Sequence, residues 1–293
     1  MQFIHILLKY ILCVVFLFNL SFLKAQHVTH PHISDTTWAK DYPPFRIAGN
    51  LYYVGTYDLS SYLITTSQGH ILINTGLDSS AWLIRRHVES LGFKFQDIKI
   101  LIASHAHFDH VGAMALIKKM TGAKMMIHEK DASVLANGGS TDFALGGFGP
   151  MFEPVKADRR LHDKDLIKLG NMEIMVLHHP GHTKGSCSFL FDVRDRHRIY
   201  RVLIANMPSI LSQAKFPAMP AYHHIGKDYG HTFDSMKNVQ FDIFLAPHAS
   251  QFDLHKKHQP GDPYHPEAFF DRPGYDSSLN ALEKVYRKKM GKQ

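Results

Sequence analysis

Four side chains that can bind a metal ion stand within six residues of this chain. The sequence His-Ala-His-Phe-Asp-His occupies residues 105–110 and directly follows the apolar run 98–103, which predicts a buried strand. Neutral imidazoles and carboxylates are ligands that suit Zn²⁺. They cannot all face one way on a strand or a helix, but on a turning loop they can diverge toward two metal centres. The candidate ligands in this segment are His105, His107, Asp109 and His110.

Six residues cannot saturate two ions, so further ligands must come from elsewhere in the chain. His182 follows the predicted strand 172–178, and His248 follows the predicted strand 241–246. Loops at matching strand ends of a rigid sheet are where an active site is expected. We therefore expect both to join the 105–110 segment, and we interpret most of the 22 histidines as surface or structural residues. That second group includes His128, His162, His223, His224, His255 and His258.

The remaining pattern predicts a single α+β domain without internal repeats. Short apolar or alternating runs predict strands, and apolar residues at three- and four-residue spacing predict helices. The order of these elements indicates two sheets packed together and covered by helices. The predicted strands are 45–48, 51–54, 61–66, 70–74, 98–103, 123–127, 165–169, 172–178, 186–193, 198–205 and 241–246. The predicted helices are one that starts at Asp78 and stops at Gly92, and 111–120, 129–136, 228–239 and 275–289.

At residues 105–110, with His182 and His248, the chain resembles the metallo-β-lactamase superfamily and its H-x-H-x-D-H signature. The resemblance implies an αβ/βα four-layer sandwich. Through segments 137–142, 180–186 and 247–250 the chain is most similar to subclass 3 of the class B β-lactamases. In that subclass two zinc ions are bound. By resemblance, one ion would be held by His105, His107 and His182, and the other by Asp109, His110 and His248.

The resemblance also implies an activity, zinc-dependent hydrolysis of the β-lactam amide bond, and therefore antibiotic resistance. A hydroxide shared by the two ions would attack the lactam carbonyl, and the second ion would stabilise the departing nitrogen. Asp109 is the expected catalytic residue because it would orient this hydroxide. A β-lactam is the expected small-molecule partner.

Three residues after the predicted strand 198–205 bear on the choice of substrate. Relatives that resemble glyoxalase II or ribonuclease Z carry a bridging Asp where this chain has Asn206. Asn206 is neutral, so the bridge here should be hydroxide alone, which suits a lactamase. Met207 stands where many subclass 3 enzymes have a serine that organises water. Ser209 is a candidate for the substrate carboxylate, with an ordinary loop serine as the alternative.

Other residues are expected to support the site. The glycine-rich loop 137–151 predicts a flexible apolar wall for substrate, with Phe143 and Phe148 as candidate contacts; a surface loop with its own small cluster is the alternative. Asp58 and Ser104 are candidates to fix imidazole tautomers. Cys187 follows Gly-Ser and leads into an apolar run, which indicates a buried structural thiol.

Residues 1–25 are expected to be a secretory signal peptide, leaving 26–293 as the hydrolase domain. The segment has Lys9 and Lys24, no acid, a long apolar run between them and Ala25 at its end. A membrane anchor is the alternative, although the run falls short of the roughly 20 residues that a spanning helix needs. We expect a periplasmic or secreted protein without stable membrane association after cleavage.

Composition sets the outer limits of these predictions. The chain has 293 residues, of which 45% are hydrophobic, so it is not a disordered protein. Its charge of +7 includes the two lysines of the expected signal peptide, and apart from the run 287–289 the excess is spread along the sequence, which predicts no nucleic-acid partner. Two rival functions stay open: a secreted hydrolase of the same fold acting on lactones or thioesters, and a non-catalytic extracytoplasmic metal-binding protein. The oligomeric state is not predicted.

Overall fold

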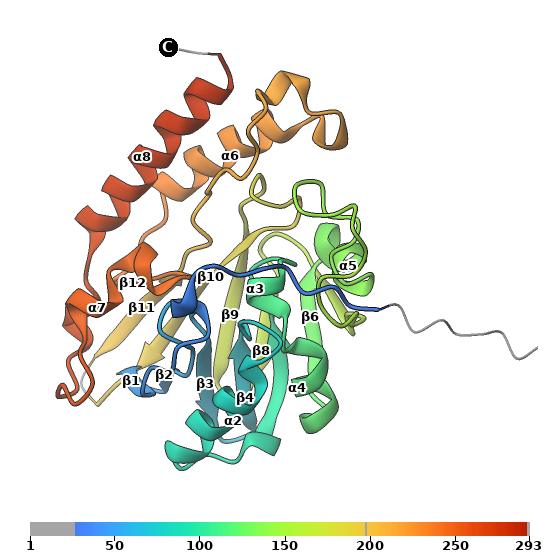
Figure 1. Cartoon of the computed structure of the whole chain (residues 1–293). Helices are drawn as coiled ribbons and strands as arrows, with labels where there is room; N and C mark the ends of the chain where they lie inside the picture. The colour runs from blue at the N-terminus through green and yellow to red at the C-terminus, as the bar shows by residue number, and fades with distance from the viewer. Residues whose placement is uncertain (1–26, 197, 292–293) are drawn as a thin grey trace, which may run out of the picture.

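The computed structural model describes residues 27–196 and 198–291 (Figure 1). The predicted signal peptide lies outside these residues. The described chain forms two β-sheets packed face to face, with helices on the outer side of each. This is the predicted four-layer α+β sandwich. Among the described residues, no helix is both long and apolar enough to cross a bilayer.

The first sheet contains seven strands whose spatial order follows the sequence order. The pairs from β1 to β4 are antiparallel, and those from β4 to β7 are parallel. Its strands are β1 (Phe45–Ala48), β2 (Leu51–Tyr53), β3 (Tyr62–Thr66), β4 (Gly69–Ile73), β5 (Ile98–Ile102), β6 (Lys124–His128) and β7 (Arg159–Leu161).

The second sheet has the order β12-β11-β10-β9-β8. Its strands pair antiparallel except for β11 and β12, which are parallel. The strands are β8 (Leu166–Leu169), β9 (Met172–His178), β10 (Cys187–Arg194), β11 (Ile199–Ile204) and β12 (Ile243–Leu245).

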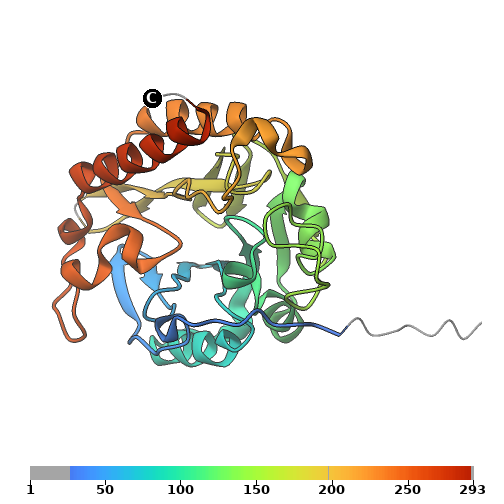
Figure 2. The same ribbon diagram turned by 45° about the horizontal axis from the view of Figure 1, so that its top comes forward.

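Helices cover the outer faces of both sheets. Figure 2 shows α6 and α8, in orange to red, on one side and the helices that cover the first sheet on the other. The helices of the first sheet are α2 (Ser80–Ser90), α4 (Met114–Thr121) and α5 (Glu129–Ala136). Those of the second sheet are α6 (Ile225–Lys237) and α8 (Arg272–Lys289). Two short helices, α3 (Phe108–Val111) and α7 (Leu254–Lys257), lie in loops.

Strand β5 shows why the apolar runs form buried strands. Ile100 and Ile102 face the core between the sheets, whereas Leu101 faces the core under the helices. Successive side chains of a strand point to opposite faces. Where both faces are covered, consecutive positions are therefore apolar, as they are from Ile100 to Ile102, and Lys99 near the start of the strand is exposed. This strand is the rigid base from which the 105–110 segment emerges.

Two local predictions differ from the structure. The predicted helix 111–120 is wrong as a single element, because the chain forms α3 and α4 with a break at Gly112. The Gly112 amide donates to the Gly76 carbonyl at 2.9 Å, and a Cβ at Gly112 would lie 2.5 Å from the Asp78 nitrogen. This close approach to another segment interrupts the helix. Strand β7 was not predicted, since its three residues have no apolar pattern and form a strand only by pairing with β6.

Candidate metal centre

The predicted ligand segments meet at one edge of the sandwich. Residues 105–110 follow β5, His182 lies between β9 and β10, and His248 follows β12. Backbone hydrogen bonds join these loops. The Cys187 amide donates to the Ser104 carbonyl at 2.8 Å, and the Ala249 amide donates to the Asp58 carbonyl at 2.7 Å. Backbone hydrogen bonds therefore hold the loops that carry the candidate ligands next to one another.

The five predicted histidines form one continuous cluster of imidazole rings. Adjacent rings lie with their centroids 4.4–5.0 Å apart, and the interplanar angles are steep. The neighbouring pairs are His105–His107, His105–His110, His105–His182, His107–His182 and His110–His248. Asp109 joins the cluster through one carboxylate oxygen, Oδ2, which lies 3.2 Å from His110 Nε2 and 3.3 Å from His248 Nε2. The structure thus brings all six predicted ligands together.

Four of these imidazoles have one nitrogen bound to a protein partner. The partners belong to different loops, and each leaves the second ring nitrogen of its histidine available. The pairs are His105 Nδ1 with Ser104 Oγ (3.2 Å), His107 Nε2 with Asp142 Oδ2 (3.3 Å), His182 Nδ1 with the Ser209 carbonyl (2.9 Å) and His248 Nδ1 with Asp58 Oδ2 (2.9 Å). The predicted tautomer-fixing roles of Asp58 and Ser104 agree with these contacts. Asp142 was not predicted in this role, because nothing local in the sequence pairs it with His107.

The donor set fits zinc. His105 Nε2 is buried and has no hydrogen-bond partner within residues 27–196 and 198–291, which is costly unless something else coordinates it. Ligand atoms of His105, His107 and His182 lie within 4.8 Å of one another, and so do those of His105, Asp109 and His110. His248 reaches the second group through Asp109. Imidazole nitrogens and a carboxylate at this spacing are the chemistry of a zinc site.

Burial holds most of the cluster in the neutral form that binds metal. It lowers the pKa of His105 well below its usual value, and the neighbouring His110 and His182 lower it further. Burial likewise lowers the pKa of His182 to about 3. At His248 burial acts in the opposite direction to the carboxylates, but hydrogen bonds to Asp109 and Asp58 raise its pKa to about 9. At His107 burial is likewise outweighed, because the hydrogen bond to Asp142 raises the pKa.

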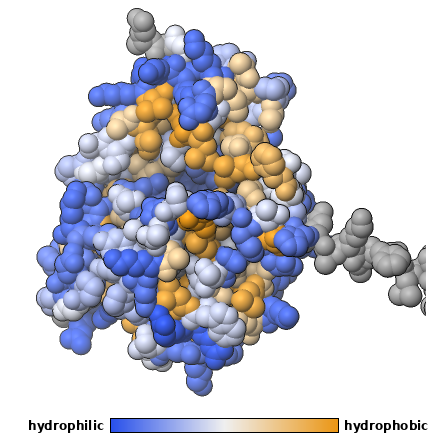
Figure 3. Space-filling view, in the orientation of Figure 1, coloured by the Kyte–Doolittle hydropathy of each residue, from blue (hydrophilic) through white to orange (hydrophobic). Residues whose placement is uncertain are grey.

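A pocket of about 270 Å³ opens over the cluster. Its walls beyond the six ligand candidates are mostly apolar, and they include Trp38, whose ring lies 5.5 Å from that of His248. Figure 3, a space-filling view in the orientation of Figure 1, shows hydrophobic residues gathered in the upper part of the molecule and near its centre. Trp38 was not predicted as a residue of the site. The other lining residues are Phe108, Leu145, Asn206, Met207, Ser209, Leu211, Pro247 and Gln251.

The glycine-rich loop contributes to this pocket differently from the prediction. Leu145 is the residue of this loop that lines it. Phe143 packs on Tyr222 with ring centroids 5.0 Å apart, and Phe148 is 88% exposed, so neither predicted contact lies on the pocket wall. Phe148 stands between Gly147 and Gly149, which both have positive φ and turn the loop tip outward.

The N-terminal segment passes in front of α3 to this loop, where the Thr29 amide donates to the Pro150 carbonyl at 2.8 Å (Figure 1).

The loop after β11 contributes three residues to the pocket lining, namely Asn206, Met207 and Ser209. Asn206 is 3% exposed, and its Nδ2 has no hydrogen-bond partner among the described residues. Met207 is buried. Ser209 faces His182, with its carbonyl 2.9 Å and its Oγ 3.1 Å from Nδ1. Its hydroxyl is thus already close to a ligand candidate.

Cys187 is buried and free, as predicted, and burial raises the pKa of its thiol.

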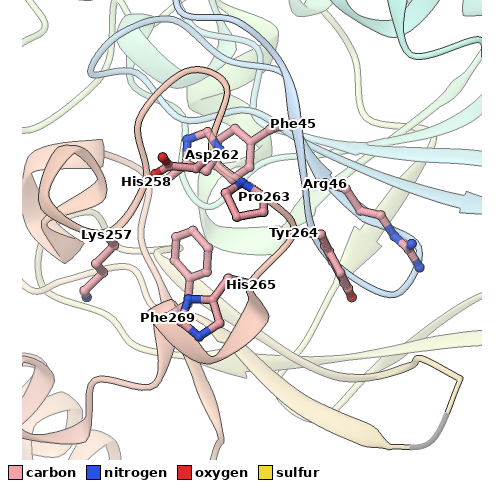
Figure 4. A pocket seen from close by; sticks show the side chains of 9 residues that line it. All are labelled: Phe45, Arg46, Lys257, His258, Asp262, Pro263, Tyr264, His265 and Phe269. Carbon is pink, nitrogen blue, oxygen red and sulfur yellow. The ribbon is translucent and has the colours of Figure 1, made fainter.

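A separate cavity of about 310 Å³ shares no residue with the histidine cluster (Figure 4). His258 stacks on Phe45 there, with ring centroids 3.6 Å apart. Its basic side chains are already engaged, since Lys257 Nζ lies 2.6 Å from the Asp271 carboxylate and Arg46 lies over the Tyr264 ring. The assembled ligands and the free imidazole nitrogen therefore place the candidate chemistry in the cluster rather than here.

Comparison with known proteins gives a consistent result. Residues 55–195 match the family model described as the metallo-beta-lactamase superfamily. The structure is similar to the class B3 di-zinc metallo-beta-lactamase LRA-12 from an Alaskan soil metagenome, at 59% identity and a TM-score of 0.89, over 90% of this chain and 100% of that one. It is also similar to a beta-lactamase from Chitinophaga pinensis, at 57% identity and a TM-score of 0.89, over 91% and 100% of the two chains.

A third solved structure, the metallo-beta-lactamase GOB-18 from Elizabethkingia meningoseptica, is 52% identical with a TM-score of 0.90. The match covers 92% of this chain and 100% of that one. Curated relatives match over shorter segments. A probable metallo-hydrolase from Methanocaldococcus jannaschii is 31% identical over 46% of this chain and 64% of its own length, and a hydroxyacylglutathione hydrolase from Bradyrhizobium is 30% identical over 37% and 34%.

Proposed function

The chain belongs to the metallo-beta-lactamase superfamily and is most like its class B3 members, and on this premise we propose that it hydrolyses the amide bond of β-lactam antibiotics with two zinc ions. The observation that carries the proposal is the convergence of five imidazoles and one carboxylate under an apolar pocket. The β-lactamases named above supply the substrate class.

We assign His105, His107 and His182 to one ion, and Asp109, His110 and His248 to the other. When bound, the ions supply Lewis acidity for the lactam carbonyl and lower the pKa of a water molecule, so that a nucleophile is available at neutral pH. The grouping of buried ligand atoms around His105 supports the first set. The contacts of Asp109 Oδ2 with His110 and His248 support the second.

The chain's own residues then position the reactants. Asp109 carries an ionised carboxylate, because His110 and His248 hold its pKa well below the usual range against the effect of burial. Such a carboxylate accepts a hydrogen bond from the attacking water and so orients it toward the lactam carbon. Trp38 and Leu145 wall the pocket and limit access of other water molecules. We propose that Ser209 contacts the substrate carboxylate.

The neutral side chain of Asn206 favours a β-lactam over a thioester. Among the relatives that the sequence resembles, those acting on thioesters or RNA have a bridging carboxylate at this position. Asn206 lines the pocket next to the ligands and carries no charge. A purified, zinc-loaded protein should hydrolyse a chromogenic cephalosporin, lose this activity with a chelator and regain it with zinc. Faster hydrolysis of a glutathione thioester or an acyl-homoserine lactone in parallel assays would contradict the proposal.

We propose that the mature protein is periplasmic or secreted. The proposal rests on the composition of residues 1–25, a basic and apolar segment that ends in Ala25. Expression of the full chain in a Gram-negative host, followed by fractionation and mass determination of the N-terminus, tests it. A mature protein that starts at Gln26 in the periplasm or medium is the expected result, and an intact N-terminus in the membrane fraction would contradict it.

A further inference from the structure

A buried carboxylate outside the ligand set connects two of the ligand loops. Asp131 lies in the first turn of α5 and is 1% exposed. Its Oδ2 atom accepts hydrogen bonds from the Ala106 amide at 3.0 Å and from the Thr183 hydroxyl at 2.7 Å. Its Oδ1 atom accepts from the Gly185 amide at 2.7 Å. Both oxygens are therefore used, and none of the three donors is a zinc ligand candidate.

The positions of these donors give the contacts their meaning. Ala106 stands between His105 and His107, and Thr183 directly follows His182. The single carboxylate of Asp131 thus joins the loop after β5 to the loop after β9. These two loops carry the three imidazoles that we assign to one zinc ion. A change in the separation of the loops would change the distance between His182 and the other two ligands.

The residues around the Asp131 carboxylate pack closely against it. A Cβ at Gly185 would lie 2.7 Å from Asp131 Cγ and Oδ1, so the close approach depends on glycine. On the other side, Ser186 Oγ accepts from the Thr183 amide at 2.8 Å and lies 2.8 Å from the Thr183 hydroxyl. The hydroxyl is therefore held in place to donate to Asp131. The network fixes the part of the loop that directly follows His182 and leads into β10.

An amide in place of the carboxylate could not keep all these contacts. Asn has one accepting oxygen and one donating nitrogen, so its nitrogen would face the Gly185 amide or the Ala106 amide and Thr183 hydroxyl. Two donors placed against each other in a buried site separate or leave a polar group unpaired. The substitution Asp131→Asn therefore conserves volume while it breaks one side of the link between the loops.

We propose that Asp131 is a positioning residue that sets the distance between the His105–His107 loop and the His182 loop, and thereby the affinity for the zinc ion that these three histidines bind. The inference rests on the proposed function for the identity of the metal. It adds a residue that touches neither the ion nor the substrate. Residues that orient metal ligands typically contribute a factor of about 10–100 to metal affinity or activity.

The test compares stepwise zinc affinities of the parent with those of Asp131→Asn, measured by competition with a chromophoric chelator. We expect one of the two affinities to fall about 10–100-fold and the other to stay within about threefold. The visible spectrum of the Co²⁺-substituted protein should change in the variant. Asp271→Asn is the matched control, because that carboxylate also accepts from a backbone amide, that of Gly274, and pairs with Lys257 outside the pocket.

A second pair of variants tests the same link from its other end. Thr183→Val removes the hydroxyl at similar volume and should weaken the same zinc site, whereas Thr183→Ser keeps the hydroxyl and should restore the parent affinity. This pair decides the question if Asp131→Asn does not fold. A Thr183→Val variant, or a folded Asp131→Asn variant, with both zinc affinities and the Co²⁺ spectrum unchanged would overturn the proposal, even if its melting temperature fell.

The same measurements separate this inference from the proposed function. A parent that binds two zinc ions but does not hydrolyse β-lactams would contradict the proposed function, while the affinity comparison would still decide the role of Asp131. A parent that binds no zinc would overturn both.

Discussion

The Asp58 carboxylate and the His248 imidazole meet at 2.9 Å, although 190 residues separate them in the sequence. The contact uses His248 Nδ1, so the ring presents Nε2 toward Asp109. Asp58 also accepts from the Ser250 amide at 2.9 Å, which fixes the backbone on the far side of the histidine. A residue from the loop between β2 and β3 of the first sheet thus orients a ligand candidate that follows β12 of the second.

Replacement of Asp58 by Asn should therefore weaken zinc binding at the His248 side. Asn can no longer serve as a charged acceptor for the imidazole, and we expect about a tenfold loss of zinc affinity or of kcat. Asp276→Asn is the control, because this carboxylate pairs with Arg272 on the surface of α8. Zinc content after dialysis and cephalosporin turnover are the measurements. Equal values for the two variants would show that the contact is dispensable.

Trp38 should contribute to substrate binding more than to chemistry. Its ring lines the pocket, with its centroid 6.3 Å from that of Phe108 and 5.5 Å from that of His248. Trp38→Ala should raise KM for a cephalosporin about tenfold with a smaller change in kcat, because it removes apolar contact area. The chain's other tryptophan, Trp82, is 61% exposed, so Trp82→Ala should leave KM unchanged. Steady-state kinetics that show a fall in kcat alone for Trp38→Ala would refute this assignment.

Acid should destabilise the fold through His179. This ring is 1% exposed and contacts the Ser188 and Ser235 hydroxyls, and burial lowers its pKa from 6.5 to about 3. Between these pH values the unfolded chain binds the proton and the folded chain does not, so the free energy of unfolding falls as pH falls below 6.5. The group contributes a slope of about 1.4 kcal/mol per pH unit in that window.

His179→Gln should remove this part of the slope, whereas His223→Gln, at an exposed position, should not. Urea unfolding of the metal-free protein at several pH values between 6.5 and 4 measures both variants without interference from zinc release. Parallel curves for His179→Gln and the parent would rule out His179 as a source of acid sensitivity.

Cys187 should be inert toward thiol reagents in the folded protein. It is 1% exposed, burial raises its pKa well above the usual value, and the thiolate is the reactive form. We expect an aromatic disulfide reagent to label it only in denaturant, and Cys187→Ala to keep full hydrolytic activity. Rapid labelling of the native protein with parallel loss of activity would be incompatible with a purely structural thiol.

The ligand set could be predicted from sequence because its information is local. Residues 105–110 form one segment, and His182 and His248 each follow an apolar strand. Their positions after predicted strands were therefore enough to predict that they meet. The partners of the ligands depend on tertiary structure instead. Asp142 reaches His107 across 35 residues through the fold of the glycine-rich loop, and no pattern marks that pairing.

Tertiary contacts also explain the errors in the fold and the pocket. The break at Gly112 depends on its contact with Gly76, which an apolar periodicity does not record. In the 137–151 loop, composition indicated an apolar wall, but the backbone turns decide which side chain faces inward. They direct Leu145 to the pocket and Phe148 to solvent. The ligand candidates could therefore be predicted from sequence, whereas the residues that line the pocket depend on tertiary packing.

Anomalous diffraction at the zinc absorption edge from crystals of the zinc-loaded protein tests the ligand assignment most directly. Two peaks are predicted, one bounded by the imidazoles of His105, His107 and His182, and the other by Asp109, His110 and His248. A single peak, or a peak whose neighbours exclude His182 or His248, would contradict the assignment of two zinc ions to these six side chains.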